Sequence, residues 1–254
     1  MASSARQEQL CMAKHFGEAE LYDDMLNSMT KLISELSQTE EVTEEESRLM
    51  IIACKNVLGV RRNSWRTIFS IEQEEVDDNA THAKWAKEYR CKIESEINEI
   101  CIGVLKLLDD KLLVGTKCSG ESKVTYLKMK GDCYRYLAEG KVGDEKKQIA
   151  ECALNAYKSA QDIAYAELSP LHPTYLLVAV SFSIFYYEIL NMYDRACSVA
   201  QQAYDEGMTE LVELEIDGGS CKDEDVIFQI LRLLTDNLNM WKFDRQKQEM
   251  GYMW

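Results

Sequence analysis

Prolines, histidines and long apolar runs are scarce in this sequence of 254 residues. Its two prolines, Pro170 and Pro173, leave the rest of the chain without the strongest helix breaker. The three histidines have no cysteine or carboxylate at metal-ligand spacing, so we predict no metal site. The most apolar run, residues 175–187 (YLLVAVSFSIFYY), is shorter than the about 20 residues needed to span a bilayer. We therefore expect a buried helix there and no membrane span.

Paired cysteine motifs are also absent, although the sequence holds nine cysteines. Their number is odd, they are scattered singly, and the opening MASSARQEQL lacks the apolar stretch of a signal peptide. We expect reduced thiols that serve mostly as small core residues. The expected location is the cytoplasm, with the nucleus as an alternative.

Positive charge is in the minority, with 29 basic against 44 acidic residues and a formal net charge of -15. A general nucleic-acid binder needs an excess of lysine and arginine, so nucleic acid is not an expected partner. The sequence contains no GxSxG, no P-loop and no GxGxxG before a helix. We predict neither an enzyme nor a cofactor site, while a catalytic centre built from distant residues stays open.

Helical periodicity is what the sequence has in abundance, and no strand pattern of convincing length accompanies it. Breakers divide the chain into about nine helices, of which two, near 44–72 and 81–114, are unusually long. Thr43 and Glu46 have the spacing of a capping box for the first of these. We predict an all-α fold with one domain over residues 1–242 and a short tail over 243–254.

Cations gather in KNVLGVRRNSWR, residues 55–66. Lys55, Arg62 and Arg66 are seven and four residues apart, which places them within about 40° of one another on a helix. Arg61 points to another side. A second set lies in residues 128–139, where Lys128 and Arg135 share a face. There Asp132 and Glu139 lie at positions that can hold Arg135 in one rotamer.

Two interpretations of these cations are open. Each cation could simply pair with one of the many nearby acids, as most surface charges do. Convergent guanidinium groups would instead suit a phosphate dianion, which arginine binds bidentately. The attraction would be local despite the net charge, because salt screens fields beyond about 8 to 10 Å.

Several stretches resemble the 14-3-3 family of phosphopeptide-binding adaptors. The matching segments occur in family order over nearly the whole chain: YDDM (22–25), KNVLGVRRNSWR (55–66), SIEQEE (70–75), YLKMKGDCYRYLAE (126–139), SFSIFYYEILN (181–191) and DNLNMW (236–241). The resemblance implies nine antiparallel helices. It also implies a dimer formed through the N-terminal helices into a cup, with one amphipathic groove in each subunit.

The resemblance also implies the site residues, position by position. The phosphate pocket would consist of Lys55, Arg62, Arg135 and Tyr136. The groove beside it would be lined by Lys128, Val180, Ser181, Ile184, Glu188, Leu233 or Leu234, Asn237 and Trp241. The dimer interface would involve His15, Leu21, Asp24, Ser64, Lys92 and Glu96.

The groove departs from the family pattern in two places. Ser181 replaces an asparagine that ordinarily holds the backbone of the bound peptide, and the shorter hydroxyl reaches less far. Losing one such hydrogen bond costs on the order of 1 kcal/mol. Residues 233–235 read as three extra residues in the last helix, which would rotate its two parts by about 300° unless a bulge or an earlier helix start absorbs them.

The dimer surface also departs from the family. Asp24 and Lys92 keep one salt-bridge pair, whereas Leu21 replaces an arginine and leaves Glu96 without its expected partner. His15 stands where the family has an apolar residue. An exposed ion pair contributes only about 0.2 to 1 kcal/mol, so we expect a weakened dimer. Ser64 matches a position whose phosphorylation disfavours dimers.

Two functions follow from this sequence. The first is a non-enzymatic adaptor that binds phosphoserine or phosphothreonine segments of partner proteins and forms homodimers or heterodimers with related chains. The second is a scaffold of the same shape with an altered groove. It would bind unphosphorylated or acidic ligands, or act mainly by heterodimerisation.

Overall fold

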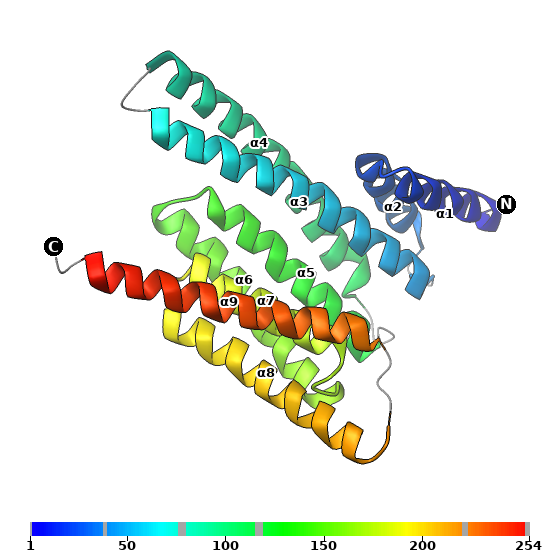
Figure 1. The fold of residues 1–254 in the computed structure, drawn as a ribbon. Helices are drawn as coiled ribbons and strands as arrows, with labels where there is room; N and C mark the ends of the chain where they lie inside the picture. The colour runs from blue at the N-terminus through cyan, green and yellow to red at the C-terminus, as the bar shows by residue number, and fades with distance from the viewer. Residues whose placement is uncertain (1, 38–39, 76–79, 115–118, 220–222, 252–254) are drawn as a thin grey trace. The chain divides into compact units, whose positions relative to one another are not determined.

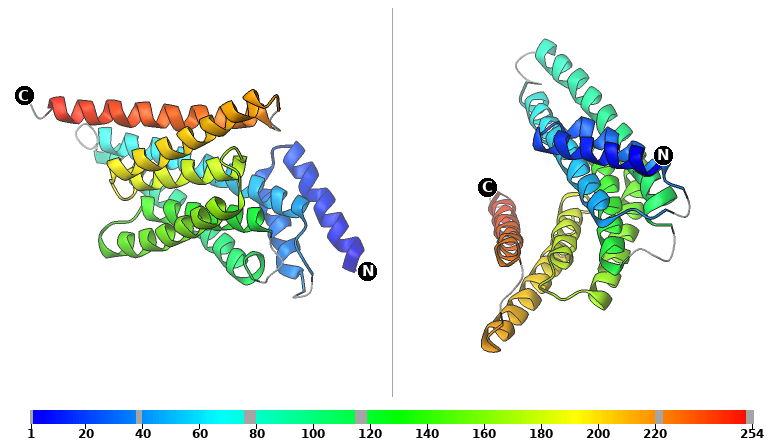
Figure 2. Two further views of the ribbon diagram at one scale, coloured as in Figure 1. Left: turned by 90° about the horizontal axis from the view of Figure 1, so that it is seen from below. Right: turned by 90° about the vertical axis from the view of Figure 1, so that its right-hand side faces the viewer.

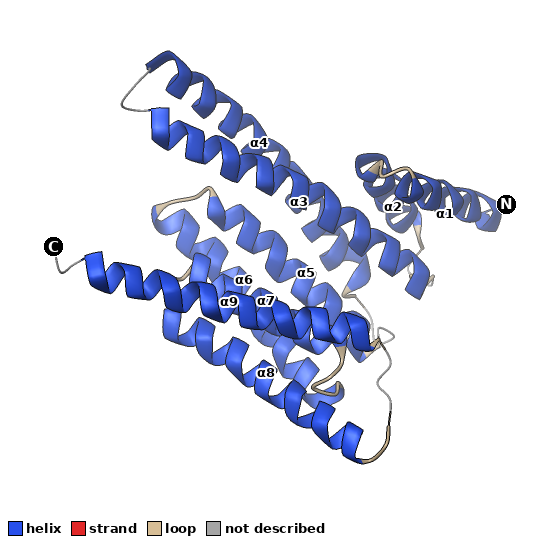
Figure 3. Ribbon diagram, viewed as in Figure 1, coloured by secondary structure: helices blue, strands red, loops and turns tan. Residues whose placement is uncertain are grey.

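A computed structural model describes residues 2–37, 40–75, 80–114, 119–219 and 223–251. These residues form helices and connecting loops, and no strand occurs among them (Figure 3). The all-α prediction is therefore confirmed. The chain divides into two compact units, Met1–Cys118 and Ser119–Trp254, and each is described separately below.

The first unit contains α1 (Ala2–Glu18), α2 (Tyr22–Glu35), α3 (Glu44–Glu75), α4 (Ala80–Leu107) and a short π-helix, η1 (Leu108–Leu112) (Figure 1). Helix α1 packs on α2 and α3, and the long helices α3 and α4 pack along each other. The sequence predicted both long helices, but not the change from α to π geometry that ends the second one.

The start of α3 carries the predicted capping box. The Thr43 amide donates to Oε2 of Glu46 over 2.8 Å, and the Glu46 amide donates back to Oγ1 of Thr43 over 3.2 Å. Arg6 of α1 adds two hydrogen bonds to the same carboxylate, from Nε and Nη2, each 2.6 Å long. Burial acts to raise the pKa of Glu46, but the bonds from Arg6 and Thr43 outweigh it and lower this pKa. The buried carboxylate thus ties α1 to the start of α3.

The second unit contains α5 (Gly120–Glu139), α6 (Gly143–Glu167), α7 (Pro173–Glu188), α8 (Tyr193–Ile216) and α9 (Glu224–Gly251). Its core is continuous from α5 to α9, and the apolar α7 packs against all four other helices. The apolar run at 175–187 is the buried helix that we expected. Helix α9 packs on α8, and the left-hand view of Figure 2 shows the two helices next to each other.

Helix α9 does not end near Trp241 but continues to Gly251. Most of the segment that the sequence set apart as a tail is therefore helical, and residues 252–254 lie outside the described part. No helix in the described ranges combines the length and apolar character that crossing a bilayer requires.

The cysteines of the described residues are free thiols, as expected, but fewer of them are core residues than we predicted. Cys54, Cys101 and Cys133 are buried, whereas Cys11, Cys91 and Cys152 are exposed. Burial next to Cys101 raises the pKa of Cys54 to about 12, so this thiol stays protonated near neutral pH.

We expect Arg6→Met to lower the free energy of unfolding by about 1 to 3 kcal/mol at neutral pH, because it leaves the Glu46 carboxylate buried with fewer partners. The pKa of Glu46 is lowered in the folded state, so its contribution is present above the unfolded pKa of about 4.3 and is lost as the pH falls. In urea denaturation, the difference in free energy of unfolding between Arg6→Met and the wild type should become smaller as the pH falls.

The matched control is Arg245→Met, because Arg245 pairs with the exposed carboxylates of Asp194 and Glu249. This variant should lose less than about 1 kcal/mol. Equal losses in the two variants, or a gap that is independent of pH for Arg6→Met, would contradict the role assigned to Glu46.

Candidate functional site

The second unit contains a hydrogen-bonded cluster around the carboxylate of Asp132 on α5. Lys128 Nζ lies 2.7 Å from Oδ2, and Arg135 Nη2 lies 3.1 Å from Oδ1. The Tyr157 hydroxyl on α6 donates to Oδ1 over 2.7 Å and accepts a bond from Arg135 Nε over 3.2 Å. Because three of these side chains recur on one face of α5, the helix itself brings them together. Tyr157 then fixes Arg135 from the neighbouring helix.

Neighbouring charges, rather than burial, determine which groups of this cluster are ionised. Burial alone would raise the pKa of Asp132, but Lys128 and Arg135, with the bond from Tyr157, hold this pKa well below its ordinary value. Burial alone would lower the pKa of Arg135, whereas the neighbouring phenols and carboxylates raise it well above that of a free arginine. Asp132 is therefore anionic and Arg135 cationic near neutral pH.

Arg135 keeps one edge of its guanidinium less occupied than the other. Its side chain is only 5% exposed, and its plane lies over the ring of Tyr136 with 4.6 Å between Cζ and the ring centroid. Nε and Nη2 are hydrogen-bonded, but Nη1 faces Glu139 and Glu188 at 3.8 Å each. That separation exceeds a hydrogen bond. Nη1 is thus an oriented donor without a short acceptor among the described residues.

Helix α7 supplies part of the predicted groove wall. Val180 and Ser181 are buried, and Ile184 and Glu188 are half-buried. Ile184 and Glu188 lie four and eight residues after Val180. Residues four apart lie on a similar face of a helix, so the three follow one another along α7. Of the four groove residues predicted on α7, Ile184 and Glu188 are therefore the ones that have surface to offer a ligand.

Helix α9 is continuous through residues 233–235, and it contains no bulge there. Leu234 is fully buried in the core, whereas Leu233 is 42% exposed. Asn237 lies one turn after Leu233 on the same face, and Trp241 is buried. The structure thus distinguishes the two leucines between which the sequence left a choice. The helix places Leu233 beside Asn237, and the bulge considered from the sequence is not needed.

Asn237 carries an unpartnered polar atom. Its Nδ2 is buried and has no hydrogen-bond partner among the residues described. A buried donor without an acceptor costs about 1 to 3 kcal/mol, so such atoms are uncommon and call for an explanation. An acceptor supplied by a ligand would satisfy it.

The cations of α3 belong to the first unit. Lys55 and Arg66 are exposed and Arg62 is half-buried. Arg61 turns away from them, as its helical phase predicted, and bonds to Asp23 over 2.8 Å through Nη2. The pocket predicted from the sequence draws Lys55 and Arg62 from this unit and Arg135 and Tyr136 from the other. The joining of these two pairs stays a prediction.

The residues predicted for the dimer interface all lie at the surface of the first unit: His15, Leu21, Asp24, Ser64, Lys92 and Glu96. Glu96, whose expected partner across the dimer is replaced by Leu21, accepts a bond within its own chain from Arg61 Nε over 3.1 Å. Helices α3 and α4 pack along each other, which brings these two residues together although 35 positions separate them.

Sequence reasoning missed two features. The first is Tyr157, because nothing in the sequence indicates that its hydroxyl bonds to Asp132 and Arg135. Trp85 and Tyr89 are exposed on α4, with ring centroids 5.6 Å apart, and Lys92 lies over Tyr89. Their spacing of four and three residues could have revealed this aromatic face.

These features define a class of protein: within the described ranges, a helical scaffold whose second unit presents an oriented arginine and a helix face of mixed apolar and polar character. The family model described as "14-3-3 protein" matches residues 12–242. The chain belongs to the 14-3-3 family.

Curated relatives agree with this assignment. A 14-3-3-like protein of Helianthus annuus is 53% identical over 246 residues, covering 96% of this chain and 93% of the relative. The 14-3-3 protein 6 of Solanum lycopersicum is 53% identical over 245 residues, with the same coverage. The 14-3-3-like protein B of Nicotiana tabacum is 53% identical over 243 residues, covering 95% of this chain and 93% of the relative.

We expect Tyr157→Phe to lower the free energy of unfolding of the second unit by about 1 to 3 kcal/mol, because the charged groups of Asp132 and Arg135 each lose a bond. Tyr204→Phe is the matched control, since the described residues give the half-buried Tyr204 hydroxyl no hydrogen bond. Chemical denaturation measures both. Equal stability of Tyr157→Phe and wild type would show that the hydroxyl does not hold the cluster.

Proposed function

We propose that this chain is a non-enzymatic adaptor that binds phosphoserine or phosphothreonine segments of partner proteins. The 14-3-3 family consists of phosphopeptide-binding adaptors, and membership supports that general role. The observation that carries the specific proposal is Arg135, a buried guanidinium fixed by Asp132 and Tyr157 with Nη1 facing no short acceptor. A phosphate oxygen is a strong acceptor for such a donor.

Carboxylates outnumber cations around Arg135, so a phosphate pocket there would need more cations than α5 supplies. In the second unit, Lys128 and Arg135 face the carboxylates of Asp132, Glu139 and Glu188. A dianion would not be attracted by that set alone. Lys55 and Arg62, which share one face of α3, would supply the missing positive charge. Arg135 then acts as the fixed donor, and the α3 cations as the attracting charges.

The groove residues have complementary roles in this proposal. Asn237 Nδ2 would donate to a backbone carbonyl of the bound segment, and Leu233 and Ile184 would contact its apolar side chains. An extended segment alternates its side chains, so a wall of mixed polarity suits it. Trp241 and Leu234 would support the wall from inside the core.

We further propose a dimer, with itself or with related chains, through the first unit. The exposed aromatic face of Trp85 and Tyr89, with Lys92 over the Tyr89 ring, supports an interface of this kind. Partners would be phosphorylated proteins of the cytoplasm or nucleus, and nucleic acid would not bind.

A second candidate rests on Ser181. This residue is 7% exposed, and its hydroxyl is shorter than the asparagine side chain that the resemblance leads us to expect. A ligand backbone would lose one hydrogen bond there. The groove would then depend less on backbone contacts and could accept unphosphorylated or acidic segments, or the chain could act mainly by heterodimerisation.

We expect a fluorescent phosphoserine peptide to bind the full chain far more tightly than its unphosphorylated twin in an anisotropy titration. The double variant Lys55→Ala, Arg62→Ala should weaken binding about ten- to a hundred-fold, because a hydrogen bond to a charged group contributes about 1.5 to 3 kcal/mol. Both residues lie on the surface of α3, so the fold should persist in circular dichroism.

The charge-matched control is Lys84→Ala, Lys147→Ala, which removes two cations that are nearly fully exposed. Its affinity should equal that of the wild type. A third peptide with aspartate in place of phosphoserine tests the second candidate. Equal affinity for the phosphorylated, aspartate and unmodified peptides would overturn the first function and favour the altered groove.

A further inference from the structure

The last nine residues of α9, 243–251, lie beyond the residues that the family model matches. The family model ends at residue 242, whereas α9 continues to Gly251. This extension is held in place: the Tyr187 hydroxyl donates to Asp244 over 3.0 Å, and Arg245 Nη1 donates to Asp194 over 2.9 Å. Figure 2 shows the end of α9 projecting past the start of α8. The extension is therefore a docked helix of this unit.

Helices α7 and α9 run in the same direction. Leu176 of α7 and Leu231 of α9 both lie close to Gly207 of α8. A Cβ atom added to Gly207 would lie 3.5 Å from Cδ2 of Leu176 and 3.3 Å from Cδ2 of Leu231. Further along the same two helices, Tyr187 stacks on Trp241 with ring centroids 5.0 Å apart. Tyr187 lies eleven positions after Leu176 on α7, and Trp241 lies ten positions after Leu231 on α9. The extension therefore begins where α7 ends.

The end of α7 is also where the arginine cluster lies. Glu188, next to Tyr187, is 3.8 Å from Nη1 of Arg135. Arg135, which donates to phosphate in the proposed function, and the first turn of the extension thus flank the same end of α7. A ligand anchored at Arg135 and lying along α9 reaches the extension within a few residues.

One face of α9 runs without interruption from the groove wall into the extension. Val226, Leu233, Met240 and Lys247 are spaced seven apart, so they stay within about 60° of one another. The three apolar members are 42% to 50% exposed, and Lys247 is exposed as well. The stripe is apolar along the groove and ends in a cation.

Lys247 is a cation without an acidic partner among the described residues. Its Nζ lies 4.5 Å from the ring centroid of Phe243, which is itself 56% exposed. Apart from Lys242, the other charges between Trp241 and Glu249 are engaged: Asp244 by Tyr187, and Arg245 by Asp194 and Glu249. In a chain with a net charge of -15, this unpaired lysine at the end of an apolar stripe matches a ligand carboxylate.

We infer that the extension lengthens the ligand groove and that Lys247, beside Phe243, binds a carboxylate of the phosphorylated partner segment. This inference rests on the proposed function. Lys247 lies six residues, or about 9 Å, along α9 from Trp241. An extended peptide covers that distance in about three residues, so the carboxylate belongs about three to five residues from the phosphorylated one.

The test uses the full chain and fluorescent phosphoserine peptides in anisotropy titrations at low salt. Three peptides carry aspartates at three to five residues before the phosphoserine, aspartates at the same distance after it, or serines at both places. The wild type should bind one acidic peptide about two- to five-fold more tightly than the neutral one, which is the range of an exposed ion pair. High salt should remove the difference.

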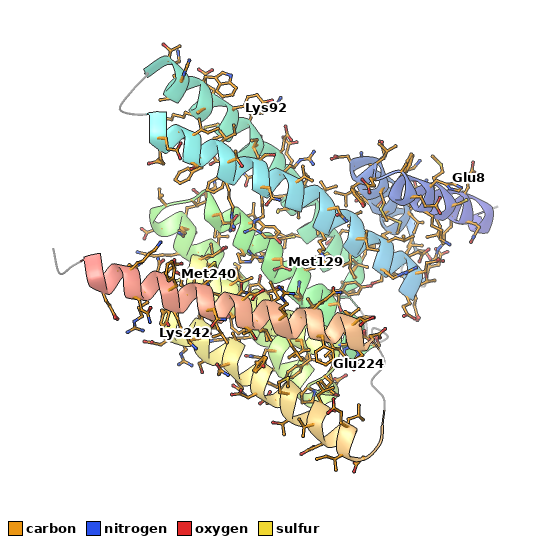
Figure 4. All side chains as sticks on the ribbon, viewed as in Figure 1. Glu8, Lys92, Met129, Glu224, Met240 and Lys242 are labelled. Atoms are coloured by element: carbon orange, nitrogen blue, oxygen red, sulfur yellow. The ribbon has the colours of Figure 1, made fainter. Side chains whose placement is uncertain are left out.

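Two variants separate a specific contact from bulk charge. Lys247→Glu should abolish or reverse the preference for the acidic peptide. Lys242→Glu makes the same change of charge one residue before the extension, but Met240 and Lys242 project to opposite sides of α9 (Figure 4). Lys242→Glu should therefore keep the preference, and both variants should bind the neutral phosphopeptide as the wild type does.

Equal wild-type affinity for acidic and neutral phosphopeptides would overturn the inference, as would an equal effect of the two lysine variants. Failure of the proposed function has a different signature. In that case the neutral phosphopeptide and its unphosphorylated twin would bind equally, whatever the flanking residues.

Discussion

A guanidinium that is buried must be neutralised and hydrogen-bonded, and the bonds among Arg135, Asp132 and Tyr157 meet that requirement. They fix two of the three nitrogens and leave Nη1 facing only distant carboxylates. The position of Asp132 comes from α5, and that of Tyr157 comes from α6. The packing of these helices therefore prepares the arginine before any ligand arrives, which reduces the entropy lost on binding.

The acidity of the chain has a role in this arrangement. Glu139 and Glu188 approach the free edge of Arg135 without a short bond, so they offset its charge while leaving the donor available. A singly charged ligand gains little against such neighbours. In the function that we propose, a dianion that also meets Lys55 and Arg62 would gain more. The same logic applies to α9, where most charges are paired and Lys247 is not. In an acidic protein, specificity thus depends on the few cations that stay without acidic partners or are held in one orientation.

Local patterns in the sequence were sufficient for the helices and for part of the site. The capping box of Thr43 and Glu46 formed as predicted because it needs only a three-residue spacing. The ion pair between Asp132 and Arg135 could also be predicted, because the two residues are three positions apart on one helix. Contacts between helices could not be predicted this way, which is why Arg61 as the partner of Glu96, and the hydroxyl of Tyr157, were missed. The sequence also could not show that α9 continues past Trp241, since the residues that dock it lie about 50 positions away on other helices.

The most direct test of this account is a crystal structure of the full chain with a bound phosphoserine peptide. We expect a phosphate oxygen about 2.7 to 2.9 Å from Arg135 Nη1, with Lys55 and Arg62 on the other oxygens. The bonds from Arg135 to Asp132 and Tyr157 should persist in the complex. A phosphate bound elsewhere, or an Arg135 that leaves Asp132 and Tyr157 to reach it, would contradict the claim that this arginine is oriented in advance.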